Sequence, residues 1–240
     1  MIGLRGEVYV RLILFDVDGT LVDSQQMICA AMAEAYGHHG LVCPPRERVL
    51  SIVGLSLEQA FVKLANGVDH PVESLTEQYK NAFFTLRAAG KYEAPLYPGV
   101  QLAIEQLAQR SDTVLGVATG KSRRGVAAML DKHDFMKVFA TIQTSDTSPS
   151  KPHPGMVLQA MAETGIDAAD TVVIGDTVFD MEMARAGGAS AIGVSWGYHD
   201  VDDLHAAGAV TVIDDFAALS SALDMVWPKA RPKNELSNHA

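Results

Sequence analysis

Residues 12–24 read Leu-Ile-Leu-Phe-Asp-Val-Asp-Gly-Thr-Leu-Val-Asp-Ser, a short apolar run that leads directly into acidic residues and a glycine. The run at 12–15 is apolar on both faces, which is typical of a strand covered by helices on either side of a parallel sheet. Similar runs recur at 114–118, 138–142, 172–174 and 191–194, with a weaker one at 210–213. Helical patterns separate most of them. Strands alternating with helices predict an α/β fold with a doubly wound parallel sheet.

The interval from 23 to 112, between the first two runs, contains no convincing strand. Apolar side chains recur there at helical spacing, first at Leu57, Phe61 and Leu64 and then at Leu75, Tyr79, Phe83 and Leu86. We therefore expect a small all-helical cap domain inserted after the first strand. The predicted order is core at 1–22, cap at 23–96, core again at 97–227, and a flexible tail at 228–240 that is rich in Pro, Lys, Asn and Ser.

Composition narrows the function classes before any motif is considered. The chain has 240 residues with 48% hydrophobic and 20% charged, as in ordinary globular proteins. Its formal net charge of -10 repels a phosphate backbone, so we expect no nucleic-acid partner. No stretch approaches the roughly 20 apolar residues of a membrane-spanning helix. The two cysteines, Cys29 and Cys43, lie in no metal-ligand spacing, and so few thiols favour a reducing cytoplasm.

Polar side chains follow three of the predicted strands, at the point where each strand ends. Asp16 and Asp18 follow the first, Thr119 and Gly120 end the second, and Asp176 and Asp180 follow the run at 172–174, preceded along the chain by Lys151. Ligands of an open parallel sheet bind beyond the carboxyl ends of its strands, so we expect these groups to meet at one edge.

Such a set is suited to phosphate chemistry. The four carboxylates Asp16, Asp18, Asp176 and Asp180 make an all-oxygen anionic site, which favours a hard cation such as Mg²⁺. Lys151, Thr119 and the backbone N–H groups after Gly120 can bind the oxygens of a phosphoryl group. One carboxylate can then attack phosphorus, and a second can act as general acid and base.

Four ordered stretches carry a resemblance: residues 16–24, Thr119, Lys151-Pro152, and Gly175-Asp176 with Asp180. They resemble the four motifs of the haloacid dehalogenase superfamily, and the helical insertion lies where a small cap inserts in that family. The resemblance implies that Asp16 is the nucleophile and Asp18 the general acid and base, with Lys151 also in the catalytic set. It implies Thr119 and Lys151 as phosphate ligands and Asp16, Asp176, Asp180 and the backbone carbonyl of Asp18 as metal ligands.

Among capped members the motifs look most like phosphoglycolate phosphatases. Asp18 favours phosphoryl transfer, because the resembled dehalogenases lack an acid at that position. Gly120 is a departure, since an Asn often follows the second-motif Ser or Thr, and one side-chain donor is therefore missing. Lys121, Arg123 and Arg124 are interpreted as a charge cluster at a helix start.

We therefore expect a Mg²⁺-dependent phosphatase, monomeric or homodimeric, that hydrolyses a small phosphorylated metabolite through an aspartyl-phosphate on Asp16. Two alternatives stay open. A phosphosugar mutase, similar to β-phosphoglucomutase, shares the aspartyl-phosphate and differs only in cap contacts. A receiver-like signalling module has a similar acidic pocket with Thr and Lys, although the large insertion argues against it.

Overall fold

The computed structural model describes residues 10–227, so the predicted tail at 228–240 lies outside the described residues. Six parallel strands form one sheet in the order β3-β2-β1-β4-β5-β6. The strands are β1 (Arg11–Phe15), β2 (Thr113–Thr119), β3 (Thr141–Thr144), β4 (Thr171–Gly175), β5 (Ser190–Val194) and β6 (Thr211–Ile213). The predicted parallel α/β fold is confirmed, and β1 lies in the middle of the sheet between β2 and β4.

The prediction of a strand at 138–142 is wrong in its position, because β3 begins only at Thr141. The apolar signal before it comes from Phe139, whose ring packs edge-on against Phe15 and Phe135, with centroid separations of 6.4 and 6.2 Å. The strand itself is mostly polar, and its buried Thr141 donates a hydrogen bond to Glu163 at 2.6 Å. Hydrophobicity therefore marked a core contact next to the strand and not the strand itself.

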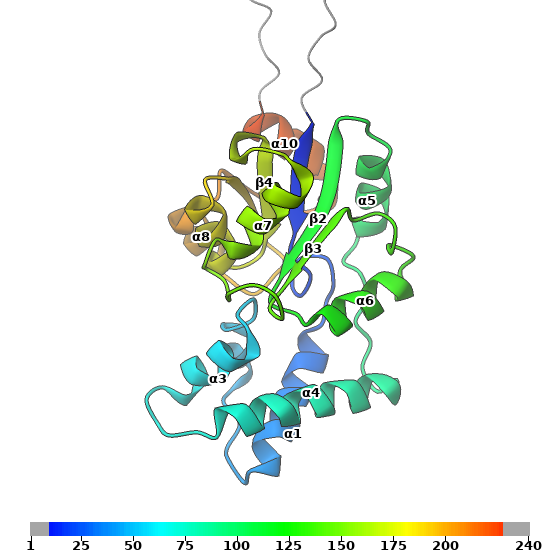
Figure 1. The fold of residues 1–240 in the computed structure, drawn as a ribbon. Coiled ribbons are helices and arrows are strands. Elements are labelled where there is room, and N and C mark those ends of the chain that lie inside the picture. Colours follow the sequence, from blue (N-terminus) through cyan, green and yellow to red (C-terminus); the bar gives the residue numbers. More distant parts are fainter. Residues whose placement is uncertain (1–9, 228–240) are drawn as a thin grey trace, which may run out of the picture.

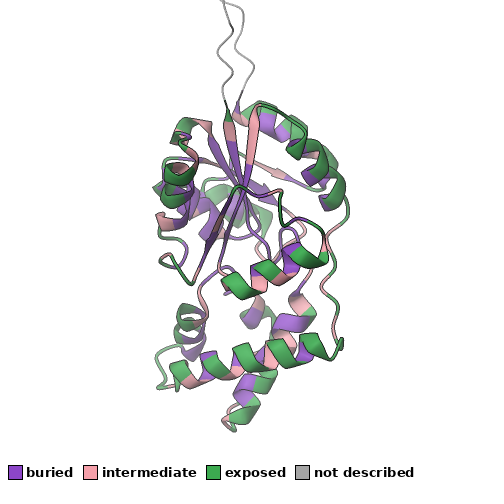
Figure 2. Ribbon diagram, turned by 45° about the vertical axis from the view of Figure 1, so that its right-hand side comes forward, coloured by how far each residue is buried: buried purple, intermediate pink, exposed green. Residues whose placement is uncertain are grey.

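Helices cover both faces of the sheet, as Figure 2 shows by the buried strands between helices with exposed outer sides. One face packs against α5 (Val100–Ala108), α6 (Arg123–Lys132) and α10 (Leu219–Val226). The other packs against α7 (Gly155–Thr164), α8 (Val178–Ala186) and α9 (Val201–Ala207). Two short 3-10 turns, η1 (Ala168–Asp170) and η2 (Phe216–Ala218), complete the layers.

Five helices lie between β1 and β2, and the first four build a core of their own. These four are α1 (Gln25–His38), α2 (Arg46–Leu50), α3 (Leu57–Ala65) and α4 (Val72–Ala88), and we call them the insertion helices. Tyr36, Phe61 and Tyr79 form the aromatic centre of this second core. Figure 1 places α1, α3 and α4 beyond one end of the sheet. Because the chain enters them directly after β1, they face the carboxyl ends of the strands.

The chain leaves and re-enters the sheet layer through two adjacent segments. Asp23 N–H donates to the carbonyl of Pro95 at 2.9 Å, and Tyr97 N–H donates to the carbonyl of Leu21 at 3.0 Å. Val22 and Leu96 form an isolated antiparallel bridge between them. This narrow, paired crossing is the backbone connection between the sheet and the insertion helices. Among residues 10–227, no helix has the length and apolar character needed to cross a membrane.

Candidate active site

The predicted site residues meet at one end of the sheet, where the order of the strands reverses around β1. Asp16 and Asp18 follow β1, Thr119 ends β2, Asp176 follows β4, and Asp180 lies in the first turn of α8. Lys151 reaches the same place from the segment between β3 and α7. All six side chains are buried. This is the crevice in which doubly wound sheets bind ligands.

Lys151 is the positive centre of the group. Its ammonium lies 3.1 Å from Asp16 Oδ1 and 2.5 Å from Asp180 Oδ1, and the side chain has no exposed surface. Burial alone would lower the pKa of Lys151, but the charges of Asp16 and Asp180 raise it above its ordinary value. Lys151 is therefore held as a cation among acids, as a phosphoryl ligand requires.

Asp16, Asp176 and Asp180 bring three carboxylate oxygens within 4.8 Å of one another. Burial raises the pKa of Asp16 to about 6, with Lys151 opposing the rise and Asp180 adding to it. Burial, followed by the charges of Asp16 and Asp180, also raises the pKa of Asp176. Three carboxylates face a single ammonium, so the ionised cluster carries excess negative charge.

This cluster fits a divalent cation. Neither carboxylate oxygen of Asp16 accepts a hydrogen bond of ordinary geometry from the described residues, although both are buried. Buried acceptors without donors are rare and are explained when a ligand completes them. Hard cations such as Mg²⁺ and Ca²⁺ prefer carboxylate and carbonyl oxygen. The donor set and the incomplete bonding of Asp16 are both compatible with such an ion.

Neighbouring groups fix the other two acids. Asp176 accepts hydrogen bonds from the Thr20 hydroxyl at 2.9 Å and from the Tyr198 N–H at 3.0 Å. Asp180 closes a capping box with Thr177, whose N–H and hydroxyl both donate to Asp180 Oδ2, at 3.1 and 2.6 Å. Asp180 thus begins α8 and also presents its second oxygen to Lys151.

The carboxylate of Asp18 is not part of the group of three. It accepts hydrogen bonds from Lys121 at 2.8 and 2.9 Å and from the Ser24 hydroxyl at 2.6 Å. The structure therefore separates two acids that lie two positions apart in sequence. Asp16 faces Lys151 and the other carboxylates, whereas Asp18 faces the insertion helices through Ser24 and Lys121.

Two glycines permit close contacts at the site. Gly19 has φ +90, and a Cβ there would lie 2.2 Å from Asp176 Oδ2. At Gly120, a Cβ would lie 2.5 Å from the carbonyl oxygen of Gly54 and 2.6 Å from that of Leu55. The loop between α2 and α3 therefore rests directly on Gly120, the position noted in the sequence as lacking a side-chain donor.

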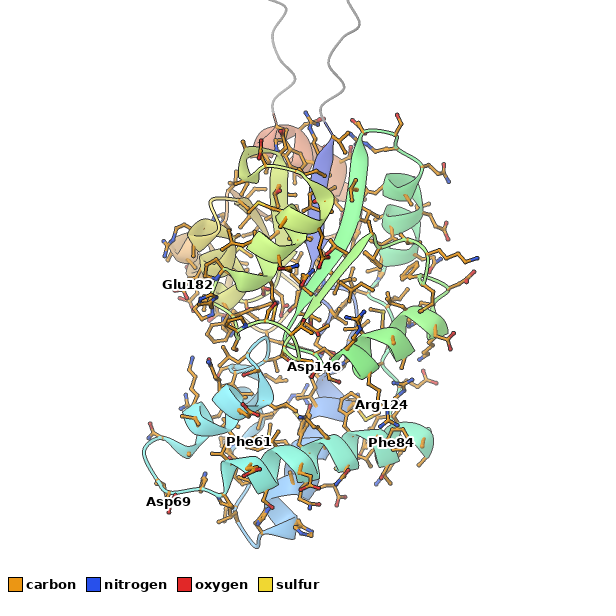
Figure 3. All side chains as sticks on the ribbon, viewed as in Figure 1. Phe61, Asp69, Phe84, Arg124, Asp146 and Glu182 are labelled. Atoms are coloured by element: carbon orange, nitrogen blue, oxygen red, sulfur yellow. The ribbon has the colours of Figure 1, made fainter. Side chains whose placement is uncertain are left out.

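A cavity of about 790 Å³ lies between this edge of the sheet and the insertion helices. Asp16, Asp18 and Thr119 line it from the sheet side, and α1, α3 and α4 line it from the other. The N–H of Ser56 donates to Ser150 Oγ across the boundary at 2.8 Å. In Figure 3, Arg124 of α6 lies opposite Phe84 of α4, and its guanidinium stacks 4.1 Å from the centre of that ring.

Sequence reasoning missed three contributors to the site. Lys121, interpreted as part of a helix-start charge cluster, instead turns inward to Asp18, and that interpretation is wrong for this residue. Tyr198 and His199 follow β5, and they contact Ser24 and Ser51 respectively. The rule applied to the other strands, that functional side chains follow a strand's carboxyl end, would have found Tyr198 and His199.

Comparisons with known proteins agree with this geometry. A family model described as haloacid dehalogenase-like hydrolase matches residues 13–194. The probable phosphatase IndB of Dickeya dadantii is 36% identical over 214 residues, covering 88% of this chain and 92% of that protein. A phosphoglycolate phosphatase of Pseudomonas putida is 31% identical over 214 residues, covering 87% of this chain and 78% of that protein.

The fold has a matching solved relative. The crystal structure of a hydrolase from Pseudomonas syringae aligns with a TM-score of 0.78 at 28% sequence identity, covering 90% of this chain and 98% of that one. Together with the family model, which spans far more than half of the residues, these matches confirm the resemblance carried by the motifs. The chain therefore belongs to the haloacid dehalogenase-like hydrolases.

Proposed function

We propose that this hydrolase is a Mg²⁺-dependent phosphatase that cleaves a small phosphate monoester through a phosphoryl group carried on Asp16. The observation that supports this most is the state of Asp16: it is buried, it lies 3.1 Å from the Lys151 ammonium, and neither oxygen accepts a hydrogen bond of ordinary geometry from the described residues. A carboxylate with free lone pairs beside a phosphate-binding cation is arranged as a nucleophile. The relatives named as phosphatases support the same reaction class.

In the first half-reaction, an oxygen of Asp16 forms a bond to phosphorus while the ester P–O bond breaks. Asp18 donates a proton to the departing alcohol oxygen. In the second half-reaction, Asp18 takes a proton from water, and the water oxygen bonds to phosphorus. The bond between Asp16 and phosphorus breaks, which releases inorganic phosphate and restores the Asp16 carboxylate. The Lys121 ammonium donates to both Asp18 oxygens and would hold this carboxylate in place for the second half-reaction.

Lys151, Thr119 and the N–H groups after Gly120 would hold the phosphoryl oxygens. Asp16, Asp176 and Asp180 would hold the cation, with the backbone carbonyl of Asp18 as a further ligand. When bound, Mg²⁺ would neutralise charge on the phosphoryl group and on the carboxylates, which lets Asp16 approach phosphorus.

We further propose that residues 23–96 act as a cap domain. Their paired crossing at Asp23 and Pro95 is the natural pivot, and the Gly54–Leu55 backbone resting on Gly120 is the contact that closes the cavity. Closure would exclude bulk water from the aspartyl-phosphate.

Trapping the intermediate tests the proposal. Enzyme turning over a radiolabelled phosphate ester with Mg²⁺ is quenched in acid, and the label is expected on Asp16 after peptide mapping. Asp16→Asn should remove both the label and phosphate release, while Asp224→Asn, an exposed acid on α10, should keep both. Label on another residue, or full turnover by Asp16→Asn, contradicts the assignment.

The same experiment separates a phosphatase from a phosphomutase. A phosphatase transfers the label to water, so inorganic phosphate accumulates with each turnover. A mutase transfers it to a sugar phosphate and releases little inorganic phosphate. Measured with sugar monophosphates as substrates, phosphate release equal to substrate loss supports the proposed hydrolysis, and isomerisation without release opposes it.

A further inference from the structure

The cavity is larger than a minimal phosphate ester needs. Its volume of about 790 Å³ lies in the upper part of the range of about 300–1,000 Å³ that proteins use for drug-sized ligands. The alcohol released from phosphoglycolate has only two carbons. The space extends from Asp16 and Asp18 along the inner side of α4 to Phe84, which Figure 3 shows facing the sheet layer. Part of it therefore lies beyond the phosphoryl site, where the alcohol of the ester would be.

The wall of this outer part combines apolar and aromatic side chains with charged ones, among them Lys80, Arg87 and Arg124. Ile28 and Met32 of α1 and Val53 before α3 contribute aliphatic surface, and Tyr79 and Phe83 of α4 contribute two rings whose centroids lie 5.9 Å apart. The apolar part of this wall gains free energy by covering an apolar ring.

Lys121 connects the ring wall to the acid that would protonate the leaving oxygen. Its ammonium contacts Asp18 and also lies 4.9 Å from the centre of the Phe83 ring. An ester oxygen within reach of Asp18 is therefore close to Phe83. The carbon attached to that oxygen would enter the space between Phe83 and the aliphatic side chains of α1.

One polar group in the wall has no partner. Thr76, one turn before Tyr79 on α4, is 5% exposed and lines the cavity, and its hydroxyl makes no hydrogen bond to the described residues. Threonines in helices usually donate back to the preceding turn, as Thr164 does to the carbonyl of Ala160 at 2.8 Å. A buried hydroxyl without a partner costs folding free energy unless a ligand supplies one.

Resting on the phosphatase activity proposed above, we propose that the alcohol of the substrate carries an apolar ring with a hydrogen-bonding substituent, and that Thr76 is the residue that selects this substituent. The ring lies against Tyr79 and Phe83. A small acid such as glycolate fills neither the ring wall nor the bonding capacity of Thr76, so it is a poor substrate.

The proposed contact with a substrate ring is tested with two esters that differ only in whether they carry a ring. Ethyl phosphate and 2-phenylethyl phosphate have leaving groups of similar basicity, so a difference in kcat/KM reports contacts to the ring. We expect the phenyl ester to be better by at least about 10-fold, and better than phosphoglycolate by a similar factor. Equal values for the ethyl and phenyl esters, or a preference for phosphoglycolate, overturn the proposal.

Thr76 is tested with 2-(3-hydroxyphenyl)ethyl and 2-(4-hydroxyphenyl)ethyl phosphates. We expect kcat/KM for one of them to exceed kcat/KM for the unsubstituted phenyl ester by about 3- to 10-fold, which corresponds to one neutral hydrogen bond. Thr76→Val should remove this advantage, and Thr76→Ser should retain it. If Thr76→Val leaves every ratio unchanged, Thr76 does not select the substrate. Thermal unfolding of Thr76→Val is expected at the same temperature or higher, which excludes misfolding.

Binding separates this inference from the proposed function. Calorimetry with Asp16→Asn and Mg²⁺ gives dissociation constants for the ethyl and phenyl esters without turnover. Tighter binding of the phenyl ester supports the ring contact even if wild-type enzyme hydrolyses none of the esters, in which case the phosphatase proposal alone fails. Hydrolysis that depends on Asp16, combined with equal binding of both esters, keeps the phosphatase proposal and refutes the ring contact.

Discussion

The Lys121 ammonium lies 2.8 Å from one carboxylate oxygen of Asp18 and 2.9 Å from the other. Both side chains are mostly buried, at 14% and 12% exposed for Lys121 and Asp18. A pair of this kind is stronger than an exposed ion pair, because little solvent screens it. The proposed acid and base is therefore held by a residue from the loop after β2, outside its own strand.

Lys121→Met should slow the second half-reaction more than the first. Without the ammonium, the Asp18 carboxylate that takes a proton from water loses the two hydrogen bonds that orient it. We expect kcat to fall by about 10- to 100-fold, part of the roughly 10²- to 10⁴-fold that acid–base catalysis contributes. Rapid acid quench should show phosphorylated Asp16 accumulating during turnover.

The matched control is Lys132→Met, which removes an exposed lysine at the end of α6. Its kcat should equal that of the wild type. An unchanged kcat in Lys121→Met would assign Lys121 to packing against the Phe83 ring alone.

Divalent cation should stabilise the fold through Asp16, Asp176 and Asp180. The three acids repel one another in the chain alone, so a bound ion removes an unfavourable term from the folded state. Mg²⁺ at 100 times its dissociation constant should raise the free energy of unfolding by about 2.7 kcal/mol. Calorimetric melts with and without chelator measure this. Chelator should also abolish turnover, with Mg²⁺ restoring it and Ca²⁺ failing to, because Ca²⁺ favours more ligands at longer distances.

Asp16→Asn should remove most of the stabilisation by Mg²⁺. Without metal it should melt at the same temperature as the wild type or higher, since one of the repelling charges is absent. Its melting temperature should respond much less to Mg²⁺. Asp224→Asn serves as the charge control and should follow the wild type in both conditions. A full Mg²⁺ response in Asp16→Asn places the ion elsewhere.

Much of this site could be predicted because its signals are local. The apolar runs mark strands that are buried on both faces, and the acids that follow β1 and β4 meet because carboxyl ends of parallel strands share an edge. The contacts that were missed depend on tertiary packing. Lys121 points inward to Asp18 and lies against the Phe83 ring of α4, and no pattern in residues 119–124 shows where α4 lies.

The same limit explains Thr76 and Gly120. Thr76 lies on α4 beside the apolar residues Leu75 and Tyr79. The apolar periodicity therefore predicts only that this face of the helix is buried and does not show that the Thr76 hydroxyl lacks a partner. The sequence indicates a missing side-chain donor at Gly120, whereas the structure shows a backbone contact with Gly54, which lies 66 positions earlier in the chain. Long-range backbone contacts of this kind leave no periodic signal in sequence.

His199 joins the sheet layer to the insertion helices. Its Nδ1 accepts from the Val178 N–H at 3.1 Å, so the neutral ring carries its proton on Nε2, which lies 3.2 Å from the carbonyl of Ser51. Burial lowers the pKa of His199 and so favours this neutral ring. His199→Asn can keep an acceptor for Val178 but loses the reach to Ser51.

His199→Asn should therefore leave stability close to that of the wild type and increase amide hydrogen exchange in residues 51–56, with a higher KM. His199→Ala should show the same exchange and also lose about 1–3 kcal/mol of stability, because the Val178 N–H loses its acceptor. His205 on α9 is exposed, so His205→Asn should change neither the stability nor the exchange at residues 51–56. If protection from amide hydrogen exchange at residues 51–56 stays unchanged in both His199 variants, His199 does not link the sheet layer to this loop.

Gly120→Ala should keep the loop between α2 and α3 from resting on the sheet layer. The new Cβ would lie 2.5 Å from the Gly54 oxygen and 2.6 Å from the Leu55 oxygen, and backbone atoms cannot rotate away as a side chain can. We expect kcat/KM to fall by about 10- to 100-fold, in the range that misplaced reacting groups cost. Stability should change little, because the loop can lift into solvent. Gly37→Ala is the control, since a Cβ there meets no atom within 4 Å. Small-angle scattering should show Gly120→Ala more expanded than Gly37→Ala. An unchanged kcat/KM together with an unchanged radius of gyration would show that this contact does not close the cavity.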